Sequence, residues 1–323
     1  MTSIKMSILI IGGCGFIGSH IAEALQSSGD DLIIFDRNAD RQQSSTQACA
    51  NYIKGEFGNR GELSRIFEKH VISHVVHLAA STLPSSSNRD PEFDVVTNVC
   101  DTIALLDLCV QHSVGKILFL SSGGTVYGIP RYLPINEDHP TDPICSYGIT
   151  KLAVEKYLQL YNHLYGLDFV ALRAANPYGP RQLPTARQGV ISVFAFQMLC
   201  GNEIVIWGDG DVVRDYFHIR DLADLCILAL KAPVSGVFNA GSGVGRSLRD
   251  VIASLERVIG CDARVHFEKG RALDVPRVVL DHKLAQQAFG WNQKIGFEEG
   301  LQSVKQWLLK EWIPGPSEPR ASR

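Results

Sequence analysis

The chain has 323 residues, of which 45% are hydrophobic and 20% are charged, and its formal net charge is −3. A chain of this length can bury a large core, and we expect it to form two lobes. The weak negative charge argues against nucleic acid or an anionic membrane surface as a partner, so an anionic ligand would have to be held by a few placed arginines.

The eight cysteines are scattered, and they form neither a C-x-x-C pair nor a cysteine–histidine cluster with zinc spacing. We therefore expect no metal site. We expect no secretory leader, and no apolar run of the sequence approaches the ~18 residues that a membrane-spanning helix needs. We expect a cytoplasmic protein with reduced thiols.

Short apolar segments alternate with helical periodicity through the first half of the chain. Near-continuous apolar strands between helices are typical of a parallel sheet covered on both faces. Right-handed crossovers make such a sheet doubly wound, so we predict a Rossmann-like α/β fold. The predicted strands are Ser7–Ile11, Asp31–Phe35, His74–Ala79, Lys116–Ser121 and Asp168–Arg173.

Two predicted helices, Phe93–Val110 and Tyr147–Tyr165, are apolar around more of their circumference than one sheet-facing stripe requires. Either both are deeply buried, or the helix pairs of two subunits form a four-helix bundle at a dimer interface. We expect a homodimer through about residues 93–111 and 147–165.

After Pro177 the pattern becomes irregular up to Asp211, and helix or strand character returns at Asp221–Leu230 and Gly236–Ala240. This predicts a smaller mixed α/β lobe assembled from separated segments. We assign residues 1–176 and about 213–241 to the first lobe, and about 177–212 and 242–311 to the second. Residues 312–323 are expected to form a flexible tail.

The first strand leads into a turn with the spacing G-x-x-G-x-x-G, formed by Gly12, Gly15 and Gly18, and a helix follows. Such a turn brings bare amides and a helix N-terminus against a pyrophosphate. The next strand leads to Asp36, whose carboxylate would accept hydrogen bonds from the adenosine ribose and repel a 2′-phosphate. We predict NAD as the cofactor, with NADP as the alternative because Arg37 is adjacent.

Tyr147 and Lys151 lie four residues apart and therefore share one face of a helix. A free tyrosine has a pKa of about 10, which is too high for a base near neutral pH. A lysine ammonium one turn away, together with a positively charged nicotinamide, would favour the phenolate and lower that pKa. Lys151 could also hold the nicotinamide ribose.

These motifs occur in order with Asn98 and with the segment S-S-G-G-T-V-Y-G at residues 121–128. In this combination the chain resembles the extended short-chain dehydrogenase/reductases, specifically the NAD-dependent epimerase/dehydratase branch, over about residues 6–310. It is similar to UDP-glucose 4-epimerases and their N-acetylhexosamine relatives. The cofactor contacts that the resemblance implies are Gly12, Gly15, Phe16, Ile17, Gly18, Asp36, Arg37, Glu56, Phe57, Leu78, Ala79, Ala80, Asn98, Ser121, Tyr147 and Lys151.

Segments in the second half resemble the substrate-binding parts of the same family. Arginines in two of them would bind a diphosphate, for which paired guanidiniums are well suited. Trp207 would form an apolar wall for uracil, and Asp274 would accept from the nucleotide ribose. The substrate contacts that the resemblance implies are Asn176, Val190, Trp207, Arg214, Arg271, Asp274 and Val278.

The chain departs from these epimerases at Gly123, where they commonly carry a serine that hydrogen-bonds the 4-oxygen of the sugar. We expect Thr125, or else Ser122, to supply that hydroxyl; a bound water or an unaided Tyr147 are the other possibilities. Related 4,6-dehydratases carry an Asp-Glu pair where this chain has Gly124 and Thr125. Epimerase-reductases of the GDP-fucose type carry a cysteine where Thr125 stands, so both classes are disfavoured.

The resemblance implies a 4-epimerase of a UDP-sugar. Tyr147 would take the proton from the 4-hydroxyl while C4 delivers a hydride to NAD. The 4-keto sugar would then turn over in the pocket, and the hydride would return to its other face. Val278 stands where the family often has a bulky tyrosine, so it would leave room for an N-acetyl group unless it belongs to the core.

Two other functions remain open at this point. A 4-keto-sugar reductase, or an epimerase-like sugar or amino-acid dehydrogenase, would share the cofactor site and differ by net redox turnover. Arg214 and Arg271 argue against a substrate that lacks a diphosphate. A non-catalytic NAD-sensing or scaffold protein is disfavoured by the intact pair of Tyr147 and Lys151.

Overall fold

A seven-stranded sheet forms the centre of the protein. The structure, a computed structural model, describes residues 6–39, 50–185, 189–270 and 275–313. All neighbouring strands of the central sheet are parallel, so their carboxyl ends lie at one edge. Its strands, in spatial order, are β10 (Gly236–Ala240), β6 (Asp168–Ala174), β5 (Lys116–Ser122), β4 (Val71–His77), β1 (Met6–Ile11), β2 (Leu32–Asp36) and β3 (Ala50–Lys54).

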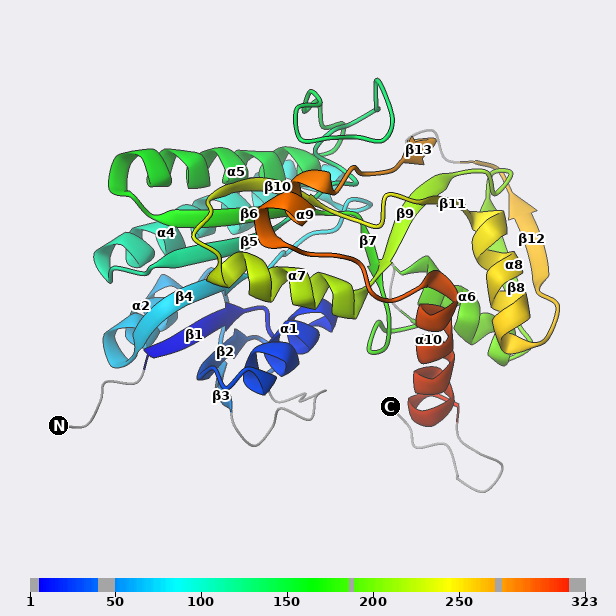
Figure 1. The fold of residues 1–323 in the computed structure, drawn as a ribbon, viewed down its shortest axis with the longest axis horizontal. Helices are drawn as coiled ribbons and strands as arrows, with labels where there is room; N and C mark the ends of the chain where they lie inside the picture. Colours follow the sequence, from blue (N-terminus) through cyan, green and yellow to red (C-terminus); the bar gives the residue numbers. More distant parts are fainter. Residues whose placement is uncertain (1–5, 40–49, 186–188, 271–274, 314–323) are drawn as a thin grey trace.

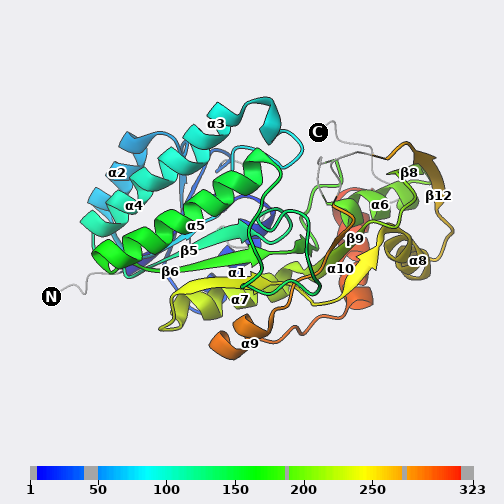
Figure 2. The same cartoon turned by 90° about the horizontal axis from the view of Figure 1, so that it is seen from above.

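Helices cover both faces of this sheet (Figures 1 and 2). Successive residues of β1 show the division, because Ile8 and Ile10 pack with one set of helices and Leu9 and Ile11 with the other. The doubly wound Rossmann-like fold predicted from the sequence is therefore confirmed. The first set is α1 (Phe16–Ser27), α7 (Ile219–Lys231) and α9 (Lys283–Phe289), and the second is α2 (Arg60–Lys69), α4 (Asp101–Gln111) and α5 (Ser146–Tyr165).

A smaller group of strands and helices lies beyond the carboxyl edge of the central sheet (Figure 1). Its helices share a separate apolar core. They are α6 (Val190–Leu199), α8 (Leu248–Ile259) and α10 (Phe297–Glu311). One small sheet contains β11 (Gly245–Ser247), β9 (Val213–His218), β13 (Arg277–Val278) and β7 (Asn176–Tyr178), and another pairs β12 (Arg264–Glu268) with β8 (Glu203–Trp207).

The segment of about residues 213–241 divides between the two parts. β9 joins the small sheet, whereas α7 and β10 join the central sheet and its helices. In the described parts of the chain, no helix is long and apolar enough to cross a membrane.

Three expectations need correction. The region after Pro177 is not irregular, since it contains α6 and β8. The edge strand β3 has no apolar run because it is only partly buried, and it was missed. The segment Phe93–Val110 is not one α-helix: it consists of α3 (Pro91–Val95), the π-helical turn η3 (Val96–Cys100) and α4.

A side-chain hydrogen bond accompanies the π-helical turn. The hydroxyl of Thr102 donates to the carbonyl oxygen of Asn98 at 2.6 Å. His77 Nε2 lies 2.9 Å from the same hydroxyl, so the carbonyl of the turn is tied to the carboxyl end of β4. Such π-helical turns inside α-helices are frequent at functional sites.

Candidate active site

The glycine turn after β1 leaves the backbone bare where a pyrophosphate would lie. Gly12 has φ of +82°, and a Cβ there would lie 3.0 Å from the amide nitrogen of Ala79. A Cβ at Gly18 would lie 2.5 Å from the carbonyl oxygen of Gly12. Helix α1 starts after Gly15 without a side-chain cap and without an acidic residue in its first turn. Its amides and its dipole therefore suit an anion.

Asp36, at the end of β2, is held beside this turn. Its Oδ2 accepts a hydrogen bond from the Cys14 amide at 3.0 Å, and its Oδ1 accepts one from the Asn38 amide at 2.8 Å. The carboxylate thus lies between the glycine turn and the end of the second strand. This is the position from which it can bind the adenosine ribose.

Three predicted cofactor contacts, Arg37, Glu56 and Phe57, line a cavity of about 220 Å³. Arg37 and Glu56 form a largely exposed ion pair of 3.9 Å. The remaining lining residues are Gly58, Ser81, Phe93, Thr97 and Asp101.

The loop after β4 closes the site from another side. The amide of Leu78 donates to the carbonyl oxygen of Ile11 at 2.9 Å, and Ala79 lies against Gly12. Ala80 is followed by Ser81, whose amide donates to Oδ1 of the buried Asn98 at 3.2 Å. Phe16 and Ile17 begin α1. These surroundings fit a dinucleotide, whose nicotinamide would then lie toward α5.

Tyr147 is the second residue of α5, and Lys151 lies one turn further on the same helix. Lys151 is buried, its ammonium donates to the carbonyl oxygen of Leu120 at 2.8 Å, and its Nζ lies 5.5 Å from the centroid of the Tyr147 ring. The predicted pairing of the two side chains is therefore present in the structure.

The electrostatics of the pair differ from the expectation. Burial lowers the pKa of Lys151 to about 8, although Glu155 and Asp94 oppose this shift. Burial, reinforced by Cys145 and Asp94, raises the pKa of Tyr147 above its ordinary value. The protein alone therefore holds Tyr147 as the neutral phenol, and a cationic nicotinamide is the charge that would favour the phenolate.

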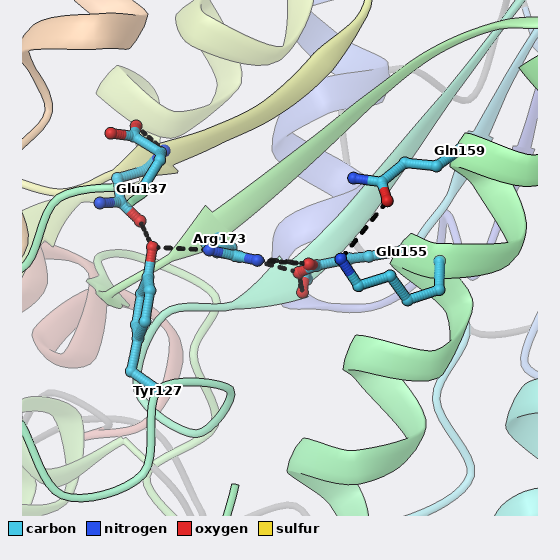
Figure 3. A network of polar contacts seen from close by, with 8 residues as sticks. Tyr127, Glu137, Glu155, Gln159 and Arg173 are labelled. Atoms are coloured by element: carbon cyan, nitrogen blue, oxygen red, sulfur yellow. Dashed lines mark hydrogen bonds and ion pairs between the residues drawn. The ribbon is translucent and has the colours of Figure 1, made fainter. Parts of the chain in front are cut away.

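A buried polar network is formed by Glu155 of α5, Arg173 of β6 and Tyr127 (Figure 3). Glu155, one turn beyond Lys151 on α5, forms an ion pair of 2.7 Å with Arg173 of β6. Ser121 donates its hydroxyl proton to Glu155, and Arg173 also donates to the Tyr127 hydroxyl at 2.9 Å. The side chain of Ser121, a predicted cofactor contact, is therefore engaged by a carboxylate of the protein.

The structure explains why residue 123 is a glycine. A Cβ at this position would lie 2.5 Å from Cδ1 of Leu280 and 2.9 Å from the carbonyl oxygen of Arg173. A serine would therefore require both the Leu280 side chain and the backbone at Arg173 to move. Among the described residues, Thr125 Oγ1 is a buried oxygen without a hydrogen-bond partner, whereas Ser122 ends β5 half-buried. Which of the two hydroxyls faces the sugar stays a prediction, with Thr125 ranked before Ser122.

Three predicted substrate contacts lie on neighbouring strands of the small sheet: Asn176 on β7, Arg214 on β9 and Val278 on β13. The Asn176 amide donates to the carbonyl oxygen of Asp215 at 3.2 Å, and Arg214 donates to that of Val275 at 2.7 Å. Val278 is 1% exposed and packs in a cluster with Val126 and Tyr127. Its burial supports the core interpretation of this residue.

The other predicted substrate contacts are more dispersed. Trp207 ends β8 and is 42% exposed, and Val190 is the first residue of α6. Arg271 and Asp274 lie outside the residues that the structure describes.

Sequence reasoning missed the side chains that hold the start of α5. The residue before the helix, Cys145, provides no side-chain cap. Instead, Asn88 Oδ1 accepts from the Ser146 amide at 2.8 Å, and Ser87 Oγ accepts from the Tyr147 amide at 3.1 Å. Asp94, buried nearby, accepts from the Ser146 hydroxyl at 2.6 Å. The sequence offered a signal for Asp94 alone: it stands four residues before Asn98 in a helical segment, a spacing that allows the two side chains to hydrogen-bond.

Comparison with known proteins identifies the family. Residues 8–241 match the NAD dependent epimerase/dehydratase family. The chain belongs to this family. It is 36% identical over 301 residues to a putative UDP-glucose 4-epimerase of Methanocaldococcus jannaschii, covering 93% of this chain and 98% of the relative.

Solved structures of family members share the fold over almost the whole chain. The UDP-glucose 4-epimerase of Thermotoga maritima, solved with UDP-glucose, gives a TM-score of 0.89 at 34% identity, covering 94% of this chain and 99% of that one. The Thermus thermophilus UDP-glucose 4-epimerase, in complex with NAD, gives a TM-score of 0.88 at 33% identity, covering 95% of this chain and 100% of that one.

A relative with a different name is a dTDP-4-dehydro-6-deoxyglucose reductase of Escherichia coli. It is 30% identical, and the match covers 94% of this chain and 98% of the relative. The predicted family and the NAD cofactor are confirmed.

The buried ion pair predicts a large cost in stability. Arg173→Met would leave Glu155 charged and unpaired in the interior, and we expect it to lower the free energy of unfolding by about 3–5 kcal/mol. The matched control is Arg131→Met, because Arg131 and Asp142 form a pair of 2.9 Å with both side chains 65% exposed. It should cost less than about 1 kcal/mol. Urea denaturation measures both, and equal losses would contradict the prediction.

The contact between Gly123 and Leu280 predicts a compensating pair of substitutions. Gly123→Ser should lower the free energy of unfolding by about 1–3 kcal/mol through overpacking. Adding Leu280→Ala should make the serine substitution less costly than it is in the parent chain. Gly124→Ser is the control, since a Cβ there meets only Ser122 Oγ, at 3.9 Å. Additive effects of the two substitutions in a double-mutant cycle would show that the two positions are independent.

Proposed function

We propose that this protein is an NAD-dependent isomerase that epimerises a UDP-hexose at C4, with UDP-galactose and UDP-glucose or their N-acetylhexosamine equivalents as substrates. The observation that carries the proposal is the pair of Tyr147 and Lys151 on one face of α5, 5.5 Å from ring centroid to Nζ, at the carboxyl edge of the parallel sheet. The names of the similar proteins, UDP-glucose 4-epimerases, support the choice of reaction.

Each residue of the pair has a distinct role in this proposal. The Tyr147 hydroxyl exchanges a proton with the 4-hydroxyl of the sugar, which leads through a 4-keto sugar and back. Lys151 carries a positive charge beside it and binds the nicotinamide ribose. The hydroxyl of Thr125 hydrogen-bonds the 4-oxygen, because the packing around Gly123 leaves no room for a serine there. NAD, when bound, supplies the hydride acceptor and donor.

The small sheet and its helices form the substrate lobe in this proposal. Asn176 and Arg214 lie near the carboxyl edge of the central sheet and bind the diphosphate, while Arg271 adds a second guanidinium. Trp207 provides an apolar surface for the base. An anchor at the diphosphate alone lets the sugar turn between its two orientations, which epimerisation requires.

A second candidate reaction is the reduction of a nucleotide-linked 4-keto sugar. The similarity to a dTDP-4-dehydro-6-deoxyglucose reductase over most of the chain favours it. It would use the same cofactor turn and the same tyrosine. The two reactions differ in stoichiometry, because a reductase consumes one reduced cofactor for each product and an epimerase consumes none.

The test is proton NMR of the anomeric signals with purified protein, UDP-galactose and UDP-N-acetylgalactosamine, without added cofactor. We expect the gluco epimers to appear, and the relative rates show which 2-substituent the pocket accepts. Tyr147→Phe should lower turnover by at least about 100-fold while the NAD content of the protein stays the same. Conversion only of a 4-keto sugar, with matching oxidation of NADH, would support the reductase instead.

We also propose a homodimer formed by α3, α4 and α5, which lie side by side on the outside of the molecule (Figure 2). Two of these elements, α3 and α5, together with the turn η3 carry a group of exposed apolar side chains, and exposed patches of this kind mark interaction surfaces. The group is Phe93, Val95, Val96, Ile149, Leu160, Leu164 and Tyr165.

A cytoplasmic location fits the cysteines, since all seven that the structure describes are free.

The proposed interface predicts a change of oligomeric state. Replacing Leu160 and Leu164 together by glutamate would place buried charges in the interface, and we expect a monomer in sedimentation velocity. Leu228→Glu is the control, because Leu228 is equally apolar and 41% exposed on α7, away from the interface. A double variant that still sediments as a dimer would place the interface elsewhere.

A further inference from the structure

We propose that Asp94 is a positioning residue for Tyr147, because its carboxylate joins the first turn of α5 to the loop that follows β4. The reaction assigned to Tyr147 rests on the proposed function, whereas the hydrogen bonds of the Asp94 carboxylate are present in the structure. They involve two groups of side chains, one on each side of the carboxylate.

The start of α5 depends on side chains from another segment. Ser87 and Asn88, in the short turn η2 (Ser87–Arg89), accept the amide protons of Tyr147 and Ser146. The first amides of a helix have no acceptor within the helix, so the residues that accept their protons fix the position of the helix start. Residues 87–94 therefore set where α5 begins, and with it where Tyr147 lies.

Asp94 strengthens this attachment from within the protein. It is 0% exposed, and its Oδ2 accepts from the Ser146 hydroxyl at 2.6 Å. The Thr150 hydroxyl lies 3.4 Å from the same oxygen and 3.0 Å from the carbonyl oxygen of Tyr147. Ser146 and Thr150 flank Tyr147 on the helix. One carboxylate oxygen thus fixes the turn that carries the proposed base.

The other oxygen of Asp94 faces the cofactor side. Its Oδ1 accepts from the Asn98 side-chain amide at 2.9 Å and from the Thr82 hydroxyl. Asn98 in turn accepts from the amide of Ser81, directly after the predicted cofactor contacts Leu78–Ala80. A single buried carboxylate therefore connects the loop expected to seat the nicotinamide with the helix that carries Tyr147. Errors of about 1 Å in such relative positions can cost 100-fold in rate.

The negative charge of Asp94 also affects the pKa of the catalytic pair, which a neutral side chain with the same hydrogen bonds would not do. The described residues provide Asp94 with hydroxyl and amide donors but no ion-pair partner in direct contact. Its negative charge raises the pKa of Tyr147 and that of Lys151. The other titratable groups that face the pair are Cys145 beside Tyr147, and Glu155 and His77 beside Lys151. Removing the charge while keeping the shape should make the Tyr147 phenolate easier to form.

The experiment compares Asp94→Asn with Asp107→Asn in the NAD-loaded protein. Asp107, on α4, is a matched control, because it also accepts a hydrogen bond from a hydroxyl of α5, that of Tyr161 at 2.5 Å, and Tyr161 lies far along α5 from Tyr147. Ionisation of Tyr147 is followed by ultraviolet difference absorbance against the corresponding Tyr147→Phe proteins as the pH is raised. Turnover of the UDP-sugar is measured on the same samples.

For Asp94→Asn we expect the titration of Tyr147 to move to lower pH by about one unit. We expect kcat to fall by about 10-fold or more while KM changes by less than about threefold, since the lost contacts orient the base rather than bind substrate. Asp107→Asn should leave both unchanged. An unmoved titration together with wild-type kcat in Asp94→Asn would overturn the proposal.

Two further variants keep the test decisive if Asp94→Asn does not fold. Ser146→Ala and Thr150→Val each remove a hydroxyl that contacts Asp94 but leave the charge of Asp94 in place. They should therefore lower kcat without moving the titration of Tyr147 to lower pH. Wild-type kcat in both would overturn the proposal. If the wild-type protein epimerises no UDP-sugar but the Asp94→Asn titration still moves, the proposed function is wrong and the role of Asp94 stands.

Discussion

Helix α5 has to carry charged side chains into the interior, and much of the surrounding structure compensates for them. Lys151 and Glu155 are both buried on the face of α5 that packs against the sheet. A buried charge without partners is costly, so each has dedicated ones. Arg173 neutralises Glu155 from β6, and the carbonyl oxygen of Leu120 on β5 accepts from Lys151. These contacts fix the helix relative to the middle of the sheet before any ligand arrives.

A second set of contacts ties the small sheet to the same place. Asp215, on β9, is buried and accepts hydrogen bonds from the amides of Ser242, Gly243 and Leu280. Leu280 then fills the space beside Gly123 at the end of β5. The wall of the candidate site is therefore made by both parts of the molecule. A side chain in one part decides which residue the other can carry.

The parts of this arrangement that follow from local sequence could be predicted, and those that follow from distant contacts could not. The glycine turn, Asp36 and the Tyr-x-x-x-Lys spacing are local patterns at the ends of strands or on one helix, and parallel strands bring such ends together. The edge strand β3 has too little buried surface to show an apolar run. The caps on α5 come from Ser87 and Asn88, which have no sequence relation to the helix. The contact of Leu280 with Gly123 joins residues far apart in the chain, so the missing serine had no explanation before the structure.

The π-helical turn η3 shows how one continuous helical segment serves two different neighbours. A π turn contains one residue more than an α turn, and each residue advances an α-helix by about 100°. The extra residue therefore rotates α3 relative to α4, so that Asp94 turns toward the beginning of α5 while Leu105 and Leu106 still face the sheet. A natural variant that lost one residue between Val96 and Cys100 could keep its helix and its core, yet it would swing this carboxylate out of reach. Insertions and deletions in this short stretch should therefore be far rarer among functioning homologues than changes of residue type.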